Sequence, residues 1–134
     1  MLYSGKERNK AAGVTLALSD AANKCLVELE QINDRILRAC FSTTQVKMTF
    51  IALYAPKNES SDSDKDTFYQ SLSDITNKVH FHYILIMCGD FNVKVAYQEY
   101  APTVIGPHGL SEINENGLRL IDYCVTNGMI VGST

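Results

Sequence analysis

The residue types best suited to chemistry lie in the segment Gly89-Asp90-Phe91-Asn92, which follows the apolar run at 83–88. Glycine allows a sharp turn of the backbone, and residues two apart in extended backbone face the same side. We therefore expect Asp90 and Asn92 to point together into a cleft while Phe91 turns back to the core. A carboxylate and an amide at the end of a strand can hold a metal ion or orient a water molecule. The same residues also suit a purely structural Gly-Asp turn closed by an Asx hydrogen bond.

A second candidate is Tyr54, in Tyr54-Ala55-Pro56 at the end of the run at 46–54. This run is rich in β-branched and aromatic residues, which indicates a strand. Pro56 ends the strand because proline cannot donate to a ladder. The Tyr54 hydroxyl could donate a hydrogen bond to a phosphate. The alternative is a strand-end tyrosine with a buried ring and a solvated hydroxyl.

Histidines and aspartates elsewhere form weaker candidates. His108, in Gly106-Pro107-His108-Gly109, lies in a loop that could approach nucleic acid or be an ordinary turn. His80-Phe81-His82 could place two imidazoles on one strand face, but no third metal ligand lies nearby in sequence. The alternating aspartates at 62–66 look like the start of a calcium loop. They lack its sixth-position glycine and twelfth-position glutamate, so we expect a surface loop before a helix.

Hydrophobic periodicity predicts the elements that must position these residues. Strands are expected at 13–18, 26–30, 36–41, 46–54 and 83–88, helices at 66–79 and from Asn114 or Asn116 to Asn127, and a last strand from 129. The three strands between 26 and 54 are closely consecutive, which is typical of an antiparallel meander. The run at 83–88 is continuously apolar, so we expect that strand to be buried on both faces. The helices should bury apolar stripes at Phe68, Leu72, Ile75 and Val79, and at Leu118, Ile121, Cys124 and Val125.

Length and composition are those of one mixed α/β globular domain. The 134 residues are 46% hydrophobic and carry 12 basic and 15 acidic side chains, a net charge of −3. No strongly basic patch of the kind a tight nucleic-acid binder needs is evident. A polar N-terminus without an apolar stretch and the lack of a long apolar run predict an intracellular protein, cytoplasmic or nuclear, with no membrane span. The four cysteines are expected to be reduced thiols in the core.

Several motifs occur in an order that matches a known family. They are Gly13-Val14-Thr15-Leu16-Ala17-Leu18, Tyr54-Ala55-Pro56, Phe68-Tyr69 and Gly89-Asp90-Phe91-Asn92, followed by Asn114-Glu115-Asn116-Gly117-Leu118-Arg119-Leu120. Together they resemble the endonuclease/exonuclease/phosphatase family, which has the DNase I-like fold. The likeness is closest to the endonuclease domain of LINE-type non-LTR retrotransposons, which is associated with a reverse transcriptase, and to the related craniofacial-development-protein-2-like chains.

The resemblance implies a four-layer α/β/β/α sandwich and hydrolysis of DNA phosphodiesters that depends on Mg²⁺, or on Mn²⁺ in its place. It implies that Asp90 orients or deprotonates the attacking water. Asn92 would contact the phosphate and, with Asp90, help to hold metal. Tyr54 would contact the phosphate or the leaving group. His108 is a further candidate for substrate binding, from its loop rather than from the resemblance.

The family also places an Asn and a metal-binding Glu before the glycine strand, and an Asp and an Asp-His pair near its end. Neither set is found in this sequence. We therefore expect a disordered arm at 1–10 and a partial domain at 11–134, weakly active or inactive alone. The alternative is a non-catalytic remnant that acts as a binding module or has no function. A calcineurin-like phosphatase is disfavoured because its Asp-x-His and Gly-Asn-His elements do not occur.

Overall fold

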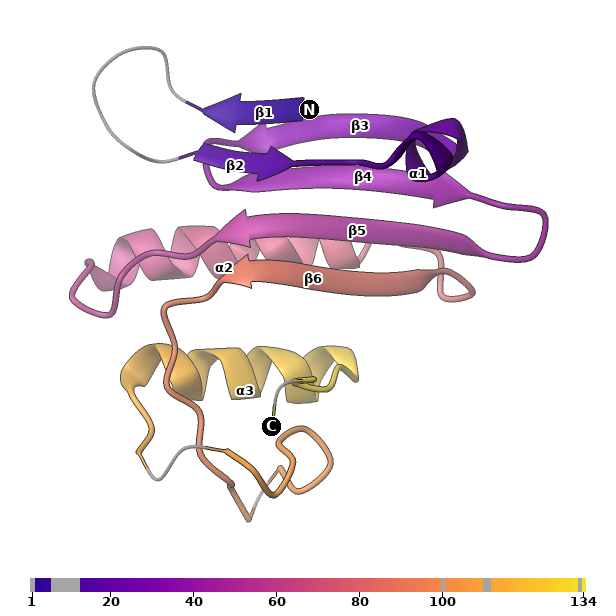
Figure 1. The fold of residues 1–134 in the computed structure, drawn as a ribbon. Helices are drawn as coiled ribbons and strands as arrows, with labels where there is room; N and C mark the ends of the chain where they lie inside the picture. The colour runs from indigo at the N-terminus through magenta and orange to yellow at the C-terminus, as the bar shows by residue number, and fades with distance from the viewer. Residues whose placement is uncertain (1, 6–12, 100, 110–111, 133) are drawn as a thin grey trace. The chain divides into compact units, whose positions relative to one another are not determined.

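The computed structural model describes residues 2–5, 13–99, 101–109, 112–132 and 134, and Figure 1 shows their path. The chain divides into two compact units. The first unit comprises Met1–Ala55 and Asn77–Asp90, and the second comprises Pro56–Thr76 and Phe91–Thr134.

The first unit contains the strands. Its elements are β1 (Leu2–Gly5), β2 (Gly13–Leu16), α1 (Asp20–Cys25), β3 (Leu26–Asn33), β4 (Ile36–Ser42), β5 (Lys47–Tyr54) and β6 (Ile84–Asp90). The strands β3, β4, β5 and β6 lie side by side in that order, and β1 pairs with β2. The pairs β3–β4 and β4–β5 are antiparallel, which confirms the predicted meander, whereas β5–β6 is parallel.

The centre of this sheet, on β4 and β5, is buried. Ile36, Ala39 and Ile51 have no exposed surface. A smaller cluster forms around Val14 and Leu37. Consecutive residues of β5 are buried, so this strand is covered on both faces, as continuous apolar runs in central strands usually are. These contacts hold the end of β5 in place, where Tyr54 lies.

Strand β6 differs from the prediction. It lies at the end of the sheet order, and Ile84 and Ile86 are 47% and 38% exposed. Cys88 on the same face is exposed too, so it is not the core thiol that we expected. The prediction of burial on both faces was wrong because an apolar run shows affinity for a core but not whether another layer covers it. The alternate residues Leu85 and Met87 are half-buried.

The second unit is built on α2 (Asp62–Thr76) and α3 (Glu115–Asn127). Helix α2 begins four residues before the predicted start, since the Ser61 hydroxyl accepts a hydrogen bond from the Asp64 N–H at 3.2 Å and caps the helix. Its expected stripe of Phe68, Leu72 and Ile75 is buried. The fourth stripe residue, Val79, follows the helix end.

Helix α3 has the predicted ends, and its buried face includes Ile121 and Cys124 of the predicted stripe. Asn114 is its N-cap and Gly128 its left-handed C-cap, with φ of 63°. Leu118 and Val125 were expected in the core but are 41% and 48% exposed. The buried residues of the helix are Asn116, Gly117, Leu120, Ile121, Tyr123 and Cys124. Residues 129–131, expected as a strand, have no regular structure.

The mixed α/β (α+β) class is therefore confirmed, and the elements are compatible with an incomplete α/β/β/α sandwich. Residues 2–5, which the sequence places in a polar arm, form β1, while residues 6–10 of that arm lie outside the described residues. None of the helices in the described parts of the chain has the length and apolar character needed to cross a membrane.

Candidate functional site

Tyr54 and Asp90 lie next to each other at the carboxyl ends of two neighbouring strands. They are register partners in the parallel pair of β5 and β6. The Ala55 N–H donates to the Asp90 carbonyl at 2.8 Å, which continues the pairing one residue further. Because paired residues of parallel strands project from the same face, the phenol and the carboxylate share one side of the sheet edge. The Tyr54 side chain is half-buried and Asp90 is exposed.

Gly89 brings the two strands together just before Asp90. Its φ is +146°, and a Cβ built there would lie 1.9 Å from the Leu53 carbonyl oxygen. Residues other than glycine rarely adopt that φ, and no carbon atom fits 1.9 Å from a carbonyl oxygen. The expected sharp turn is not found here, because Gly89 and Asp90 both belong to β6. What Gly89 provides instead is a close approach of β6 to β5.

Arg35 joins this edge and was missed by the sequence reasoning. Its guanidinium donates to the Tyr54 carbonyl at 3.3 Å and lies 5.6 Å from the centre of the Tyr54 ring. The Tyr54 N–H in turn donates to the Arg35 carbonyl at 2.9 Å. Arg35 occupies the tight turn between β3 and β4, with its N–H on the Asn33 side chain at 2.9 Å. A basic residue between two predicted strands was the available signal, but the pairing of Ile36 with Leu53 decides its place.

The sheet edge thus holds a carboxylate, a phenol and a guanidinium within the first unit. A carboxylate can orient a water molecule, and a guanidinium matches the oxygens of a phosphate. Among the described residues, no group of three or more His, Cys, Asp or Glu side chains could hold a metal ion. Magnesium in proteins is commonly held by one or two carboxylates together with water and substrate phosphates. Asp90 alone therefore does not make up a complete metal site.

Asn92 belongs to the second unit, and its backbone is not extended. Its φ is +51°, in the left-handed region. The expectation that Asp90 and Asn92 point the same way assumed extended backbone, so that argument does not apply. The Asn92 carbonyl accepts from the Nδ2 atoms of Asn114 at 3.3 Å and Asn116 at 3.2 Å.

Asn116 is the most buried polar side chain of this group, with 2% of its surface exposed. Its Nδ2 donates to the Pro56 carbonyl at 3.0 Å as well as to Asn92, and its N–H donates to the Asn58 side chain at 3.2 Å. Its Oδ1 has no hydrogen-bond partner in the described parts of the chain. Asn116 therefore ties together the two segments that follow Tyr54 and Asp90 in sequence. The sequence alone suggested an ordinary helix start.

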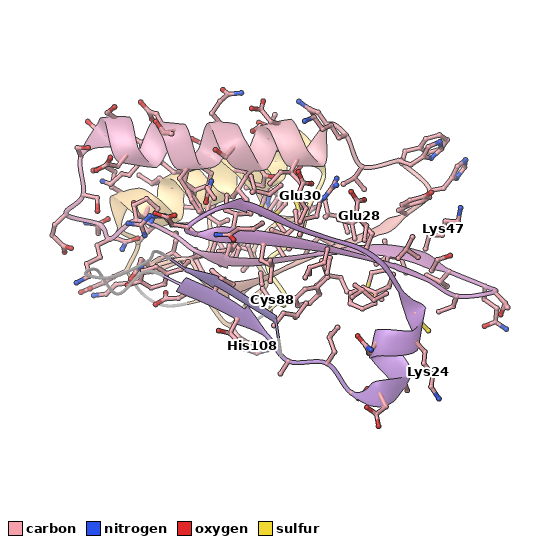
Figure 2. All side chains as sticks on the ribbon, turned by 90° about the horizontal axis from the view of Figure 1, so that it is seen from above. Lys24, Glu28, Glu30, Lys47, Cys88 and His108 are labelled. Atoms are coloured by element: carbon pink, nitrogen blue, oxygen red, sulfur yellow. The ribbon has the colours of Figure 1, made fainter. Side chains whose placement is uncertain are left out.

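His108 also lies in the second unit, in an irregular loop. Its side chain is exposed (Figure 2), and its N–H donates to the Thr134 carbonyl at 3.0 Å. Two residues earlier, the Gly106 N–H donates to the Thr134 hydroxyl at 2.8 Å, so Thr134 holds the loop. This placement fits an ordinary turn histidine and leaves a role near substrate as an expectation.

Nearly the whole chain aligns with a known mammalian protein. It is 30% identical over 135 residues to craniofacial development protein 2 of Tragulus javanicus and to the protein of the same name of Bos taurus, and each alignment covers 98% of this chain. The chain is homologous to craniofacial development protein 2. It spans about a quarter of the length of these relatives, 23% and 22% respectively. No family model matches the chain.

The region homologous to craniofacial development protein 2 includes a charged cluster where α2 and α3 begin. Arg119 pairs with Asp62 at 3.1 Å, with Asp66, and with Glu115 at 3.3 Å. The buried Lys65 reaches Glu115 at 3.2 Å. The hydrogen bond and charge of Lys65 lower the pKa of Glu115, and the carboxylates around Arg119, Asp66 first, raise the pKa of its guanidinium.

The stability of the folded protein should fall in acid because Glu115 loses its charge. Because its folded-state pKa lies below the ordinary value of 4.5, its contribution is present above that pH and is lost as the pH falls through the lowered pKa. We expect Glu115→Gln to be less stable than wild type at pH 7, with a smaller difference at pH 3. Urea unfolding at both pH values measures this, with Glu99→Gln as a control for the loss of one exposed charge. A difference independent of pH would contradict it.

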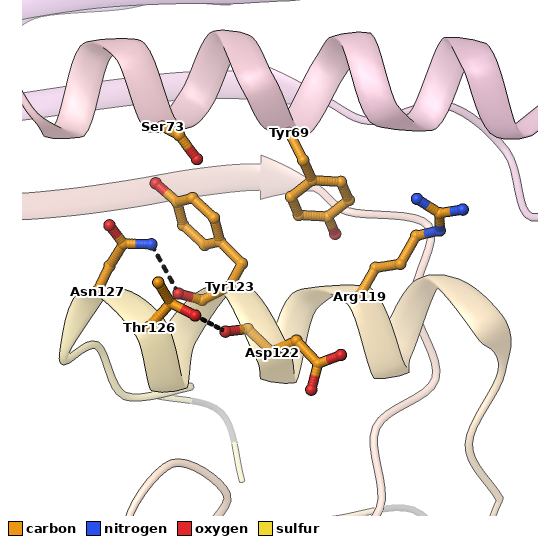
Figure 3. A pocket seen from close by; sticks show the side chains of 7 residues that line it. All are labelled: Tyr69, Ser73, Arg119, Asp122, Tyr123, Thr126 and Asn127. Atoms are coloured by element: carbon orange, nitrogen blue, oxygen red, sulfur yellow. Dashed lines mark hydrogen bonds between the residues drawn. The ribbon is translucent and has the colours of Figure 1, made fainter.

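A pocket of about 270 Å³ lies between α2 and α3 (Figure 3). It is lined by Tyr69, Ser73, Arg119, Asp122, Tyr123, Thr126 and Asn127. The Tyr69 hydroxyl is buried and has no hydrogen-bond partner among the described residues, whereas the Tyr123 hydroxyl contacts that of Thr76 at 2.5 Å. Burial raises the pKa of both tyrosines. This pocket lies in the second unit, and its lining includes neither Tyr54 nor Asp90.

Proposed function

We propose that this chain forms part of a phosphodiester-hydrolysing domain of the endonuclease/exonuclease/phosphatase family, with DNA as its substrate. The homology to craniofacial development protein 2, a protein of that family, supports the assignment over nearly the whole chain. The observation that carries the proposal is the pairing of Tyr54 with Asp90 at the ends of parallel strands, with Arg35 beside them. In this proposal the domain is of LINE-type retrotransposon origin and acts in the cytoplasm or nucleus.

Each of the three side chains has a role in the hydrolysis. Asp90 accepts a hydrogen bond from water and directs its oxygen at phosphorus, taking up the proton as the new P–O bond forms. Arg35 neutralises phosphate oxygens with its guanidinium. Tyr54 donates a hydrogen bond to a phosphate or leaving-group oxygen as the old P–O bond breaks. The leaving oxygen takes a proton from solvent and Asp90 releases its proton to solvent. The products are therefore a phosphate monoester and an alcohol, with one water molecule consumed.

Asn92 is proposed to contact the phosphate, and His108 to lie near the nucleic acid. In this proposal Mg²⁺, or Mn²⁺ in its place, adds charge neutralisation at the phosphate, with Asp90 as the carboxylate that this chain provides. The proposed hydrolysis includes no metal-bound step, because the described residues do not complete a metal site.

A non-catalytic binding module is the second candidate. It is favoured by the lack of any cluster of three or more metal-binding side chains among the described residues. A chain of this kind would bind nucleic acid or a protein through the retained fold without cleaving phosphodiesters.

Nicking of a supercoiled plasmid separates the two candidates. With Mg²⁺ we expect the wild-type chain to nick slowly, EDTA to stop it, and Asp90→Asn to slow it by at least about 100-fold, since a positioned base contributes about that much. Asp20→Asn, on α1, removes an acidic group elsewhere in the first unit and should leave nicking unchanged. A folded wild-type chain that never nicks supports the binding module, and nicking that survives Asp90→Asn contradicts the role of Asp90.

A further inference from the structure

Four consecutive rings gather on an exposed turn before β6. The Tyr83 N–H donates to the His80 carbonyl at 2.8 Å, which closes the turn. The His80 ring lies 5.3 Å from Phe81, 5.4 Å from His82 and 5.5 Å from Tyr83, with interplanar angles of 18°, 19° and 29°. Phe81 and His82 are 3.7 Å apart. Their planes are inclined by 37°, whereas the plane of His80 lies within 29° of each of the other three. We call these four side chains the ring cluster at 80–83.

The faces of this ring cluster are open. Phe81 is 84% exposed, and His80 and His82 are exposed too. A phenylalanine with that much accessible surface is unusual in a folded chain and marks an interaction site when it lies in a patch. Val46 and Ile84, in the neighbouring segments of the same unit, are 40% and 47% exposed. The cluster thus offers an exposed aromatic surface with an apolar border.

Positive charge accompanies the rings. The Lys47 ammonium lies 5.4 Å from the centre of the Tyr83 ring, and Lys78 precedes His80 by two residues. The segments 35–58 and 77–89 contain no Asp or Glu. The acidic Glu28 and Glu30 on β3 (Figure 2) are paired with Arg38 at 2.9 and 2.7 Å. The charge at the rings is therefore locally positive although the whole chain is acidic.

A metal site does not explain the two histidines. Nitrogen lone pairs lie in the plane of an imidazole, and two rings inclined by 19° direct them along nearly parallel planes rather than to one point. Stacked rings beside cations match one ligand class directly, because nucleobases stack on aromatic faces while phosphates pair with lysine.

We propose that the ring cluster at 80–83, with Lys47 and Lys78, is a stacking platform for single-stranded nucleic acid. Lys47 and Tyr54 are the first and last residues of β5, about 23 Å apart at the usual rise of a strand. The platform is therefore a separate site from the Tyr54–Asp90 edge and does not depend on the proposed hydrolysis.

Anisotropy titrations of fluorescein-labelled dT12 and rU12 with the full chain test this, in EDTA so that nothing is cleaved. We expect Phe81→Ala to weaken binding about tenfold or more, and Phe81→Trp to restore it. Lys47→Gln should reduce the salt dependence by about one phosphate contact, a slope change of about 0.7. The DNA and RNA arms show which strand the platform prefers.

Two controls keep the test specific. Val27→Ala trims another apolar side chain that is 70% exposed, on β3, and should bind like wild type. Circular dichroism of each variant checks that the fold is kept. Equal binding by Phe81→Ala and wild type would overturn the proposal. So would binding to anionic vesicles that depends on Phe81 while neither oligonucleotide binds.

Discussion

Gly89→Ala is expected to destabilise the protein by roughly 3–5 kcal/mol, because strain and a steric clash add at this position. A φ of +146° is accessible to glycine and strained for alanine, and the new Cβ would lie 1.9 Å from the Leu53 carbonyl oxygen. That oxygen belongs to β5 and cannot move without breaking the pairing with β6. The loss should therefore appear in the free energy of unfolding measured with urea.

The matched control is Gly132→Ala. A Cβ at Gly132 meets nothing within 4 Å, so its free energy of unfolding should stay within about 0.5 kcal/mol of wild type. Because Gly89 immediately precedes Asp90, a folded remnant of Gly89→Ala should also lose any nicking that wild type shows. Similar unfolding curves for the two variants would mean that β6 does not approach β5 as closely as described.

Asn116→Ala is the second large expected effect, a loss of roughly 2–4 kcal/mol. The substitution removes the Nδ2 amide with its two hydrogen bonds and leaves the buried Pro56 carbonyl without this partner. A buried polar group without a partner costs about 1–3 kcal/mol. It also leaves a small cavity at a position that is 2% exposed. The Asn92 carbonyl keeps its bond from Asn114, which limits the loss.

Two further variants separate hydrogen bonding from packing at Asn116. Asn116→Asp keeps the size of the side chain but turns an acceptor oxygen toward the carbonyls of Pro56 and Asn92, so at pH 7 it should be at least as unstable as Asn116→Ala. Asn127→Ala removes an amide that bonds within its own helix, to the Tyr123 carbonyl at 2.8 Å, and should cost under about 1 kcal/mol. An Asn116→Asp variant as stable as wild type would contradict the described hydrogen bonds.

Local signals in the sequence determined much of the fold. The alternating and β-branched runs predicted the meander of β3, β4 and β5, and residue type predicted that the last helix starts at Asn114 or Asn116 and ends at Asn127. These features follow from short-range hydrogen bonds and backbone preferences, which involve residues close in sequence. The order of motifs also carried the resemblance that the homology to craniofacial development protein 2 supports.

Tertiary structure alone decided the features that depend on distant partners. Apolar residues of β6 are exposed and the buried face of α3 only partly matches the predicted stripe, because periodicity shows which residues are apolar but not which side is covered. Arg35 meets Tyr54 only through the register of β4 on β5. Asn116 is a helix residue by sequence, but its partners at Pro56 and Asn92 lie 60 and 24 residues away. Such contacts are set by chain packing rather than by neighbours in sequence, and the contact of Arg35 with Tyr54 is the one that builds the candidate site.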